Sequence, residues 1–158
     1  MKSLKPSTSF PFGFVAVVAC GDNEIDAPIR RHFDARLGSR VNYFCLGELG
    51  GVKNLLSPPK DEFREYVLQK IRDVYAVFLK RRGGKIPVKL NPSGLVILVN
   101  HSHCGKYSLD GIDFDDERQE EAFHTGELQK AEKVIKQTFP GINTEYHYFL
   151  KEEQRFAW

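Results

Sequence analysis

Four short runs of apolar residues recur along the chain, and each has the length and the β-branched or aromatic content of a strand. They cover residues 14–19, 41–46, 95–99 and 146–150. The first three are almost entirely apolar, which is typical of strands covered on both faces of a sheet. The fourth, YHYFL, is expected at an edge. An uncovered edge of this kind favours pairing with a second copy, which is one reason to expect a homodimer.

Helices are predicted between these strands, where apolar residues recur at steps of three and four positions. One helix is expected over residues 60–81, ended by Gly83, and another around residues 128–139, ended by the Pro-Gly pair at 140 and 141. A weaker pattern over residues 26–38 predicts a third, with Pro28 in its first turn. The two stronger patterns consist of Phe63, Val67, Ile71, Val74, Phe78, Leu128, Ala131, Val134, Ile135 and Phe139.

The alternation of strands and helices predicts an α/β fold, a parallel four-stranded sheet with helices on both faces. The chain has 158 residues, which fits one domain over residues 1–158. In such sheets ligands bind at the carboxyl ends of neighbouring strands, where the winding changes direction. Polar and sulfur-bearing residues at strand ends are therefore the first candidates for a functional site.

Charge and composition give little reason to expect a nucleic acid or a membrane as partner. The chain has 23 basic and 21 acidic residues, so its net charge is only +2. The chain contains no run of about 18 apolar residues, which is the length needed to cross a bilayer. The three cysteines are too few and too scattered for a disulfide framework, which favours free thiols and a reducing, cytoplasmic compartment.

The amino-terminal segment allows one alternative. Lys2 and Lys5 precede the apolar run that leads to Cys20, an order that imitates a signal peptide with a lipidated cysteine. However, Pro11 and Gly13 interrupt the approach, and the clean apolar run is shorter than the roughly 7–15 residues of such signals. We therefore expect a cytoplasmic protein.

Two of the predicted strands end in residues that bind metals. Cys20 and Asp22 follow the first strand in the sequence CGD, and His101 and Cys104 follow the third in the sequence HSHC. If these strands are neighbours, two thiolates and an imidazole reach one point, and this set suits a tetrahedral zinc ion. A lone cysteine in a strand is usually a core residue, and we interpret Cys45 in that way. The polar residues that accompany the cysteines in these two motifs argue against a core role for the whole group, because burying polar side chains without hydrogen-bond partners would be costly.

The two motifs, in this order, resemble the signature of the β-class carbonic anhydrases, Cys-x-Asp-x-Arg after one strand and His-x-x-Cys after a later one. The resemblance covers residues 14–150 and includes Gly105 after the second cysteine and a small-residue turn, ELGG, after the second strand. It implies that Cys20, His101 and Cys104 hold zinc, that zinc turns water into the hydroxide that attacks the substrate, and that the protein is a homodimeric lyase. The implied substrate is carbon dioxide, bicarbonate or a related small electrophile such as carbonyl sulfide.

Glu24 is the clearest departure from the family pattern, because it stands where the family has an arginine that keeps the aspartate away from zinc. Without that cation, Asp22 is expected to bind zinc as a fourth ligand and to close the site to water. Arg30 or Arg31 could take over the missing role, and His103 is a candidate for the surroundings of the site or for the surface. Two functions therefore stay open: an active hydratase in which Asp22 is catalytic, and a catalytically impaired homologue with structural zinc and a binding or regulatory role.

Overall fold

A computed structural model describes residues 14–37, 42–48, 50–81 and 94–158 of the chain. Gly83, the predicted end of a helix, lies outside the described residues. Among the described helices we find none with the length and apolar character of a membrane span. In chain order the elements are β1 (Phe14–Cys20), α1 (Asn23–Leu37), β2 (Asn42–Glu48), α2 (Val52–Leu55), α3 (Glu62–Arg81), β3 (Gly94–His101), α4 (Gly105–Leu109), α5 (Glu117–Thr138), β4 (Asn143–Leu150) and β5 (Arg155–Phe156).

The described strands form one sheet in the order β2-β1-β3-β4-β5. The strands β1 to β4 run parallel to one another, and the short β5 runs antiparallel to β4. The predicted α/β fold is confirmed, but the sheet has five strands rather than four. The missed strand contains two residues, which is too short to show a periodic pattern.

The covering of β4 by β5 corrects a second prediction. At its carboxyl end this strand is not an edge, because Phe149 and Leu150 pair with Phe156 and Arg155, and the carbonyl of Tyr148 accepts the N–H of Ala157. The argument for a homodimer from an uncovered edge therefore does not hold for residues 148–150. The homodimer itself stays a prediction that rests on the resemblance.

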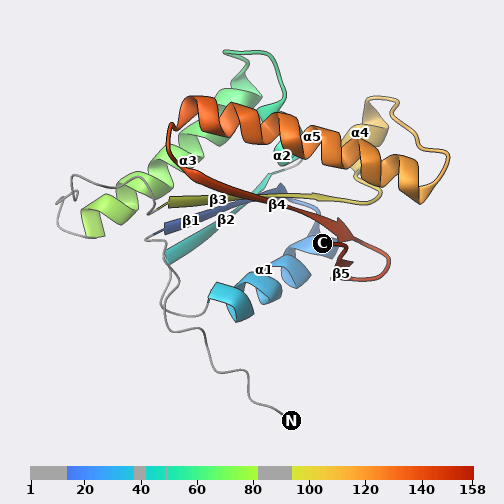
Figure 1. Cartoon of the computed structure of the whole chain (residues 1–158), viewed down its shortest axis with the longest axis horizontal. Coiled ribbons are helices and arrows are strands. Elements are labelled where there is room, and N and C mark those ends of the chain that lie inside the picture. Colours follow the sequence, from blue (N-terminus) through green and yellow to red (C-terminus); the bar gives the residue numbers. More distant parts are fainter. Residues whose placement is uncertain (1–13, 38–41, 49, 82–93) are drawn as a thin grey trace, which may run out of the picture.

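The sheet lies between two helical layers, with α1 on one face and α3 and α5 on the other (Figure 1). Its two central strands, β1 and β3, are buried at every residue, as the uninterrupted apolar runs predict. On the first face, Ile25, Ile29 and Phe33 of α1 pack against Val15 and Val17 of β1. The core on the other face includes Val52, Leu55, Val67, Leu68, Ile71, Val74, Leu128, Ala131 and Ile135.

Three details of the predicted helices are wrong. The first helix begins at Asn23 rather than at residue 26, so Pro28 lies inside it and cannot donate the usual hydrogen bond to the carbonyl of Glu24. The last helix begins at Glu117, before the first residue of the apolar pattern that predicted it. Phe63 was predicted to face the core but is 54% exposed, and its ring lies 5.9 Å from the ammonium group of Lys106 on the surface.

The direction of winding changes between β1 and β3. From β1 the chain passes through α1 to β2 on one side, then returns across β1 to β3 and continues to β4 on the other side. Open α/β sheets bind their ligands at such a switch point, outside the carboxyl ends of the strands. Cys20 is the last residue of β1, and His101 is the last residue of β3.

Candidate metal centre

Cys20, His101 and Cys104 meet at the switch point of the sheet. Cys104 stands directly before α4, so a short turn links it to the end of β3. One possible ligand atom from each residue lies within 4.8 Å of the other two, and the two Sγ atoms are 4.0 Å apart. The three residues are 5%, 1% and 5% exposed, respectively. The structure thus brings together the three side chains predicted to bind metal, and the group could hold a metal ion.

The ring of His101 is arranged as that of a metal ligand. Its Nδ1 lies 2.8 Å from the carbonyl oxygen of Ser102, and because a carbonyl only accepts, Nδ1 carries the proton. Nε2 then has a free lone pair, and this atom is buried without a hydrogen-bond partner in the described part of the chain. Histidines that bind metal through one nitrogen commonly donate to a carbonyl through the other. A bound ion would therefore satisfy an atom that is otherwise unfavourably buried.

The two thiols influence one another strongly. A hydrogen bond from Cys104 lowers the pKa of Cys20 to about 4, although burial acts in the opposite direction. The same hydrogen bond raises the pKa of Cys104, with burial adding to the effect. The arrangement thus favours ionisation of one thiol of the pair, and a cation between the sulfurs would favour loss of the second proton as well.

The donor set determines which metals fit. Two sulfurs and one imidazole nitrogen suit zinc and other ions that prefer sulfur and nitrogen. Magnesium and calcium prefer oxygen ligands, so the group is a poor match for them. Three protein ligands leave one position of a tetrahedron for water or for a further side chain.

Asp22 lies close to the group in sequence but is held by other partners. Its Oδ1 accepts a hydrogen bond from the backbone N–H of Glu24 at 2.9 Å, and its Oδ2 accepts one from the ammonium group of Lys151 at 3.0 Å. Burial raises the pKa of Asp22, but these two donors outweigh it, and the pKa lies below its usual range. The structure does not include Asp22 in the group of three, so its role as a fourth ligand stays a prediction.

The cation beside Asp22 is neither of the predicted arginines. Arg30 donates from Nε to both carboxylate oxygens of Asp26, at 3.0 and 2.8 Å, and Arg31 is exposed on α1. Lys151 comes instead from the turn after β4, and its Nζ also lies 3.1 Å from the carboxylate of Glu24. Glu24 therefore does not simply repel Asp22, because both carboxylates share one ammonium group.

His103 and Cys45 lie outside the group. The imidazole of His103 is on the surface, 3.3 Å from the carboxylate of Glu152, and both side chains are 60% exposed. Its backbone faces inward, and its N–H donates to Glu120 of α5 at 2.6 Å. Cys45 packs against the core on the α1 face, and burial raises the pKa of its thiol, as expected for a core cysteine.

The small-residue turn after β2 supports the segment that bears Cys20. Gly50 and Gly51 have positive φ angles of 87° and 39°. A Cβ atom on Gly51 would lie 2.5 Å from the carbonyl carbon of Ala19 and 2.6 Å from the nitrogen of Cys20. Because these neighbours are backbone atoms that cannot rotate away, glycine is needed at residue 51.

A pocket of about 330 Å³ adjoins the group at Cys104. Its lining includes five carboxylates, so it would repel anions and admit neutral or cationic molecules. The lining residues are His103, Cys104, Ser108, Ile112, Asp113, Phe114, Asp115, Asp116, Glu117 and Glu120.

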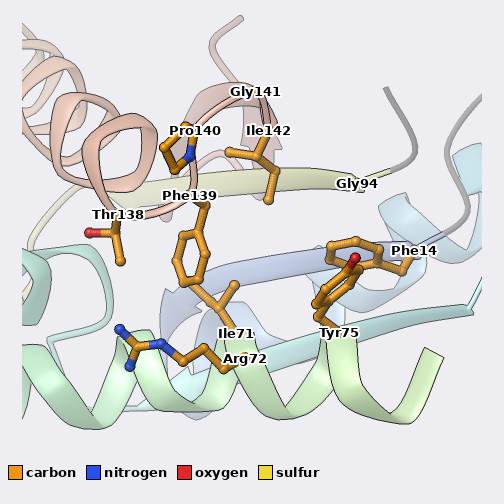
Figure 2. Close-up of a pocket in the computed structure, with 10 residues that line it drawn as sticks. All are labelled: Phe14, Ile71, Arg72, Tyr75, Gly94, Thr138, Phe139, Pro140, Gly141 and Ile142. Carbon is orange, nitrogen blue, oxygen red and sulfur yellow. The ribbon is translucent and has the colours of Figure 1, made fainter. Parts of the chain in front are cut away.

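A second pocket, of about 320 Å³, lies at the other end of the strands, where Phe14 begins β1 and Gly94 begins β3 (Figure 2). Aromatic and aliphatic side chains from α3 and from the turn between α5 and β4 surround it, and Arg72 is the one charged residue among the described residues that line it. The described residues of this pocket include no group of metal ligands. The metal group and its neighbouring pocket are therefore the better candidates for chemistry.

Comparisons of the chain with protein-family models, with curated proteins and with solved structures found no significant match. Fold and site alone thus define the class: an α/β protein whose mostly parallel sheet carries a Cys-His-Cys group that could hold a metal ion at its switch point.

Sequence reasoning missed two residues near the group, Lys151 and Glu120. Each reaches the site from an element distant in sequence, and each resembles the many solvated charges of the chain. For Glu120 a weak signal existed, because its spacing from Leu128 and Ala131 places it near the buried face of α5.

Proposed function

We propose that the protein is a zinc-dependent lyase that hydrates carbon dioxide or a related small electrophile, as a divergent relative of the β-class carbonic anhydrases. One observation carries the proposal: Cys20, His101 and Cys104 converge at the switch point with a buried, unpartnered Nε2 on His101. The order of the two motifs along the chain supports it. The free thiols favour a cytoplasmic location.

Zinc is the metal that best matches this donor set. Held by Cys20, His101 and Cys104, it would act as a Lewis acid that lowers the pKa of water. Two thiolates would offset its charge, so we expect weaker acidification than at a site made of histidines alone.

Asp22 and Lys151 are proposed to replace the Asp-Arg pair of the family. Lys151 holds Oδ2 and the N–H of Glu24 holds Oδ1, which keeps the carboxylate in one orientation. Each carboxylate oxygen retains a lone pair, so Asp22 can still accept a hydrogen bond from a water molecule near the three ligands. With the carboxylate held in this way, the fourth position of the metal stays open.

The charge of the neighbouring pocket bears on the substrate. Its carboxylates disfavour an anion such as bicarbonate and leave a neutral molecule such as carbon dioxide unaffected. We therefore expect weak binding of bicarbonate, with a high KM for dehydration and little inhibition of hydration by bicarbonate.

A purely structural zinc site is the second candidate, and the deep burial of all three ligands favours it. In that case the protein would be a non-catalytic relative with a binding or regulatory role. The two candidates agree on metal content and differ on whether the metal can be reached by substrate.

Metal analysis combined with a carbon dioxide hydration assay tests the proposal. We expect close to one zinc per chain, and we expect Cys104→Ser to lose metal and stability together, because a structural zinc contributes on the order of 10 kcal/mol. Cys45→Ser is the matched control and should keep its metal. Full occupancy in a Cys20→Ala, Cys104→Ala double variant would show that the metal binds elsewhere. Hydration at the rate of buffer alone by the zinc-loaded protein would favour the structural role.

A further inference from the structure

The turn between His101 and Cys104 contains a residue in an unfavourable conformation. His103 has a φ angle of 52°, in the left-handed region that residues other than glycine rarely adopt. The turn nevertheless has to keep this shape for both ligands to face one ion. Contacts from outside the turn must therefore stabilise it.

Glu120, a buried carboxylate of α5, supplies one of these contacts. Its Oε1 accepts the backbone N–H of His103 at 2.6 Å, and the residue is only 3% exposed. A carboxylate is costly to bury unless it is hydrogen-bonded or paired, so its presence here calls for a specific role. A hydrogen bond from a backbone N–H to an ionised carboxylate is among the stronger kinds.

His124 lies behind Glu120 on the next turn of α5 and completes the arrangement. Its Nε2 is 3.7 Å from Oε1 of Glu120, and its ring is fully buried. Tyr148 stacks on the ring at 5.3 Å, and Tyr107 of α4 meets it edge-on at 4.9 Å. The imidazole is thus fixed by packing on several sides, although neither of its nitrogens makes a hydrogen bond within the described part of the chain.

We propose that Glu120 is a positioning residue for the metal centre. Its carboxylate accepts the N–H of His103 and so holds the strained turn, in which His101 and Cys104 present their ligand atoms to the same ion. This inference rests on the metal centre of the proposed function but not on the reaction catalysed there. It assigns a role in metal affinity to a residue of α5 that does not itself bind the metal.

Titration with Co²⁺, followed by visible absorption and by competition with a chelator, tests the inference. Glu120→Ala should bind Co²⁺ at least about tenfold more weakly and with altered absorption bands, since residues that orient metal ligands typically change affinity about 10–100-fold. Glu120→Gln should stay within a few-fold of the wild type, because its amide oxygen can still accept the N–H of His103. Lys133→Ala is the matched control, because this exposed residue lies on the same helix and does not line the pocket beside the metal group.

A rescue variant separates positioning from general stability. Glycine adopts a φ angle of 52° without strain, so His103→Gly in the Glu120→Ala background should recover most of the lost affinity. Urea unfolding of each metal-free variant measures stability independently. A merely structural role would lower the unfolding midpoint but leave the affinity of the folded chain unchanged. If Glu120→Ala does not fold, Glu120→Asp replaces it, because the shorter carboxylate falls short of the N–H.

These measurements distinguish a failure of the role proposed for Glu120 from a failure of the proposed metal centre. Wild-type affinity and absorption bands in the folded Glu120→Ala or Glu120→Asp variant would overturn the role of Glu120 and leave the metal centre intact. A lack of rescue by His103→Gly would overturn it as well. A wild-type chain that binds neither Zn²⁺ nor Co²⁺ would overturn both proposals.

Discussion

Replacing Lys151 with methionine removes the cation that holds Asp22 while keeping an unbranched side chain of similar length. Without the ammonium group, the carboxylate of Asp22 keeps only its bond from the N–H of Glu24. The carboxylate of Glu24 then repels it, because the charge between them is gone. Asp22 is expected to turn toward the metal and occupy the fourth position, as first predicted for a chain without the family arginine.

The size of the effect follows from the geometry of the pair. Nζ of Lys151 lies 3.0 Å from Oδ2 of Asp22, and the two side chains are only 18% and 21% exposed. A hydrogen bond to a charged group in such a setting contributes about 1.5–3 kcal/mol. The contact with Glu24 adds little, because that side chain is 66% exposed. Since about 1.4 kcal/mol corresponds to a factor of ten, the hydration rate should fall at least about tenfold.

The assay is the rate of carbon dioxide hydration by zinc-loaded protein, with the absorption of the Co²⁺ form as a report on the fourth ligand. Lys151→Arg should retain most activity, and Lys130→Met is the control because the Lys130 side chain is 67% exposed. The pKa of Asp22 is lowered and that of Lys151 is raised, so the pair stays charged between about pH 4 and 10. The variant should therefore be impaired throughout that window. Unchanged rate and absorption in Lys151→Met would refute the reasoning.

Two further predictions concern parts of the fold that support the site. Gly51→Ala should destabilise the chain by about 1–3 kcal/mol in urea unfolding and weaken metal binding, because its Cβ would meet the backbone of Ala19 and Cys20, whereas Gly105→Ala meets nothing within 4 Å. Hydrogen bonds from His147 and Arg36 lower the pKa of Glu145 to about 2, so the carboxylate stabilises the fold above its unfolded pKa of about 4.5, and this contribution is lost as the pH falls toward 2. Glu145→Gln should lose about 1–2 kcal/mol at pH 7, after allowance for solvent screening, and its stability should depend less on pH in this acid range than that of the wild type.

The alternation of apolar runs and amphipathic segments was enough to predict the α/β fold, whereas the adjacency of β1 and β3 was only a condition of the predicted metal site, and the structure fulfils it. Buried parallel strands are apolar on both faces, so their sequences identify them without further information. The same reasoning placed Cys20 and His101 at the carboxyl edge, because parallel strands all end on one side of the sheet. It could not find β5, since a two-residue strand forms only because β4 already offers an edge.

The partners of Asp22 could not be predicted for a different reason. An arginine two residues away would be visible in a motif, whereas Lys151 is 129 positions distant and pairs with Asp22 only because β4 ends beside the other strands. Nothing in the sequence around Lys151 distinguishes it from the other lysines of the chain. Charge pairing between distant segments is a property of the folded chain and requires the register of the sheet.

The position of Lys151 also changes what the site depends on. The family pattern keeps the aspartate and its cation on one short segment, but here the cation lies in the turn that joins β4 to β5. That turn is itself tied to the turn between His101 and Cys104, because the N–H of Lys151 donates to the hydroxyl of Ser102 at 2.8 Å and that hydroxyl donates to Glu152 at 3.1 Å. The orientation of Asp22 therefore depends on the packing of the last strands as well as on its own neighbours. A lysine also holds a carboxylate through one donor rather than through the paired donors of arginine, so this packing must supply the precision that a guanidinium group would provide by itself.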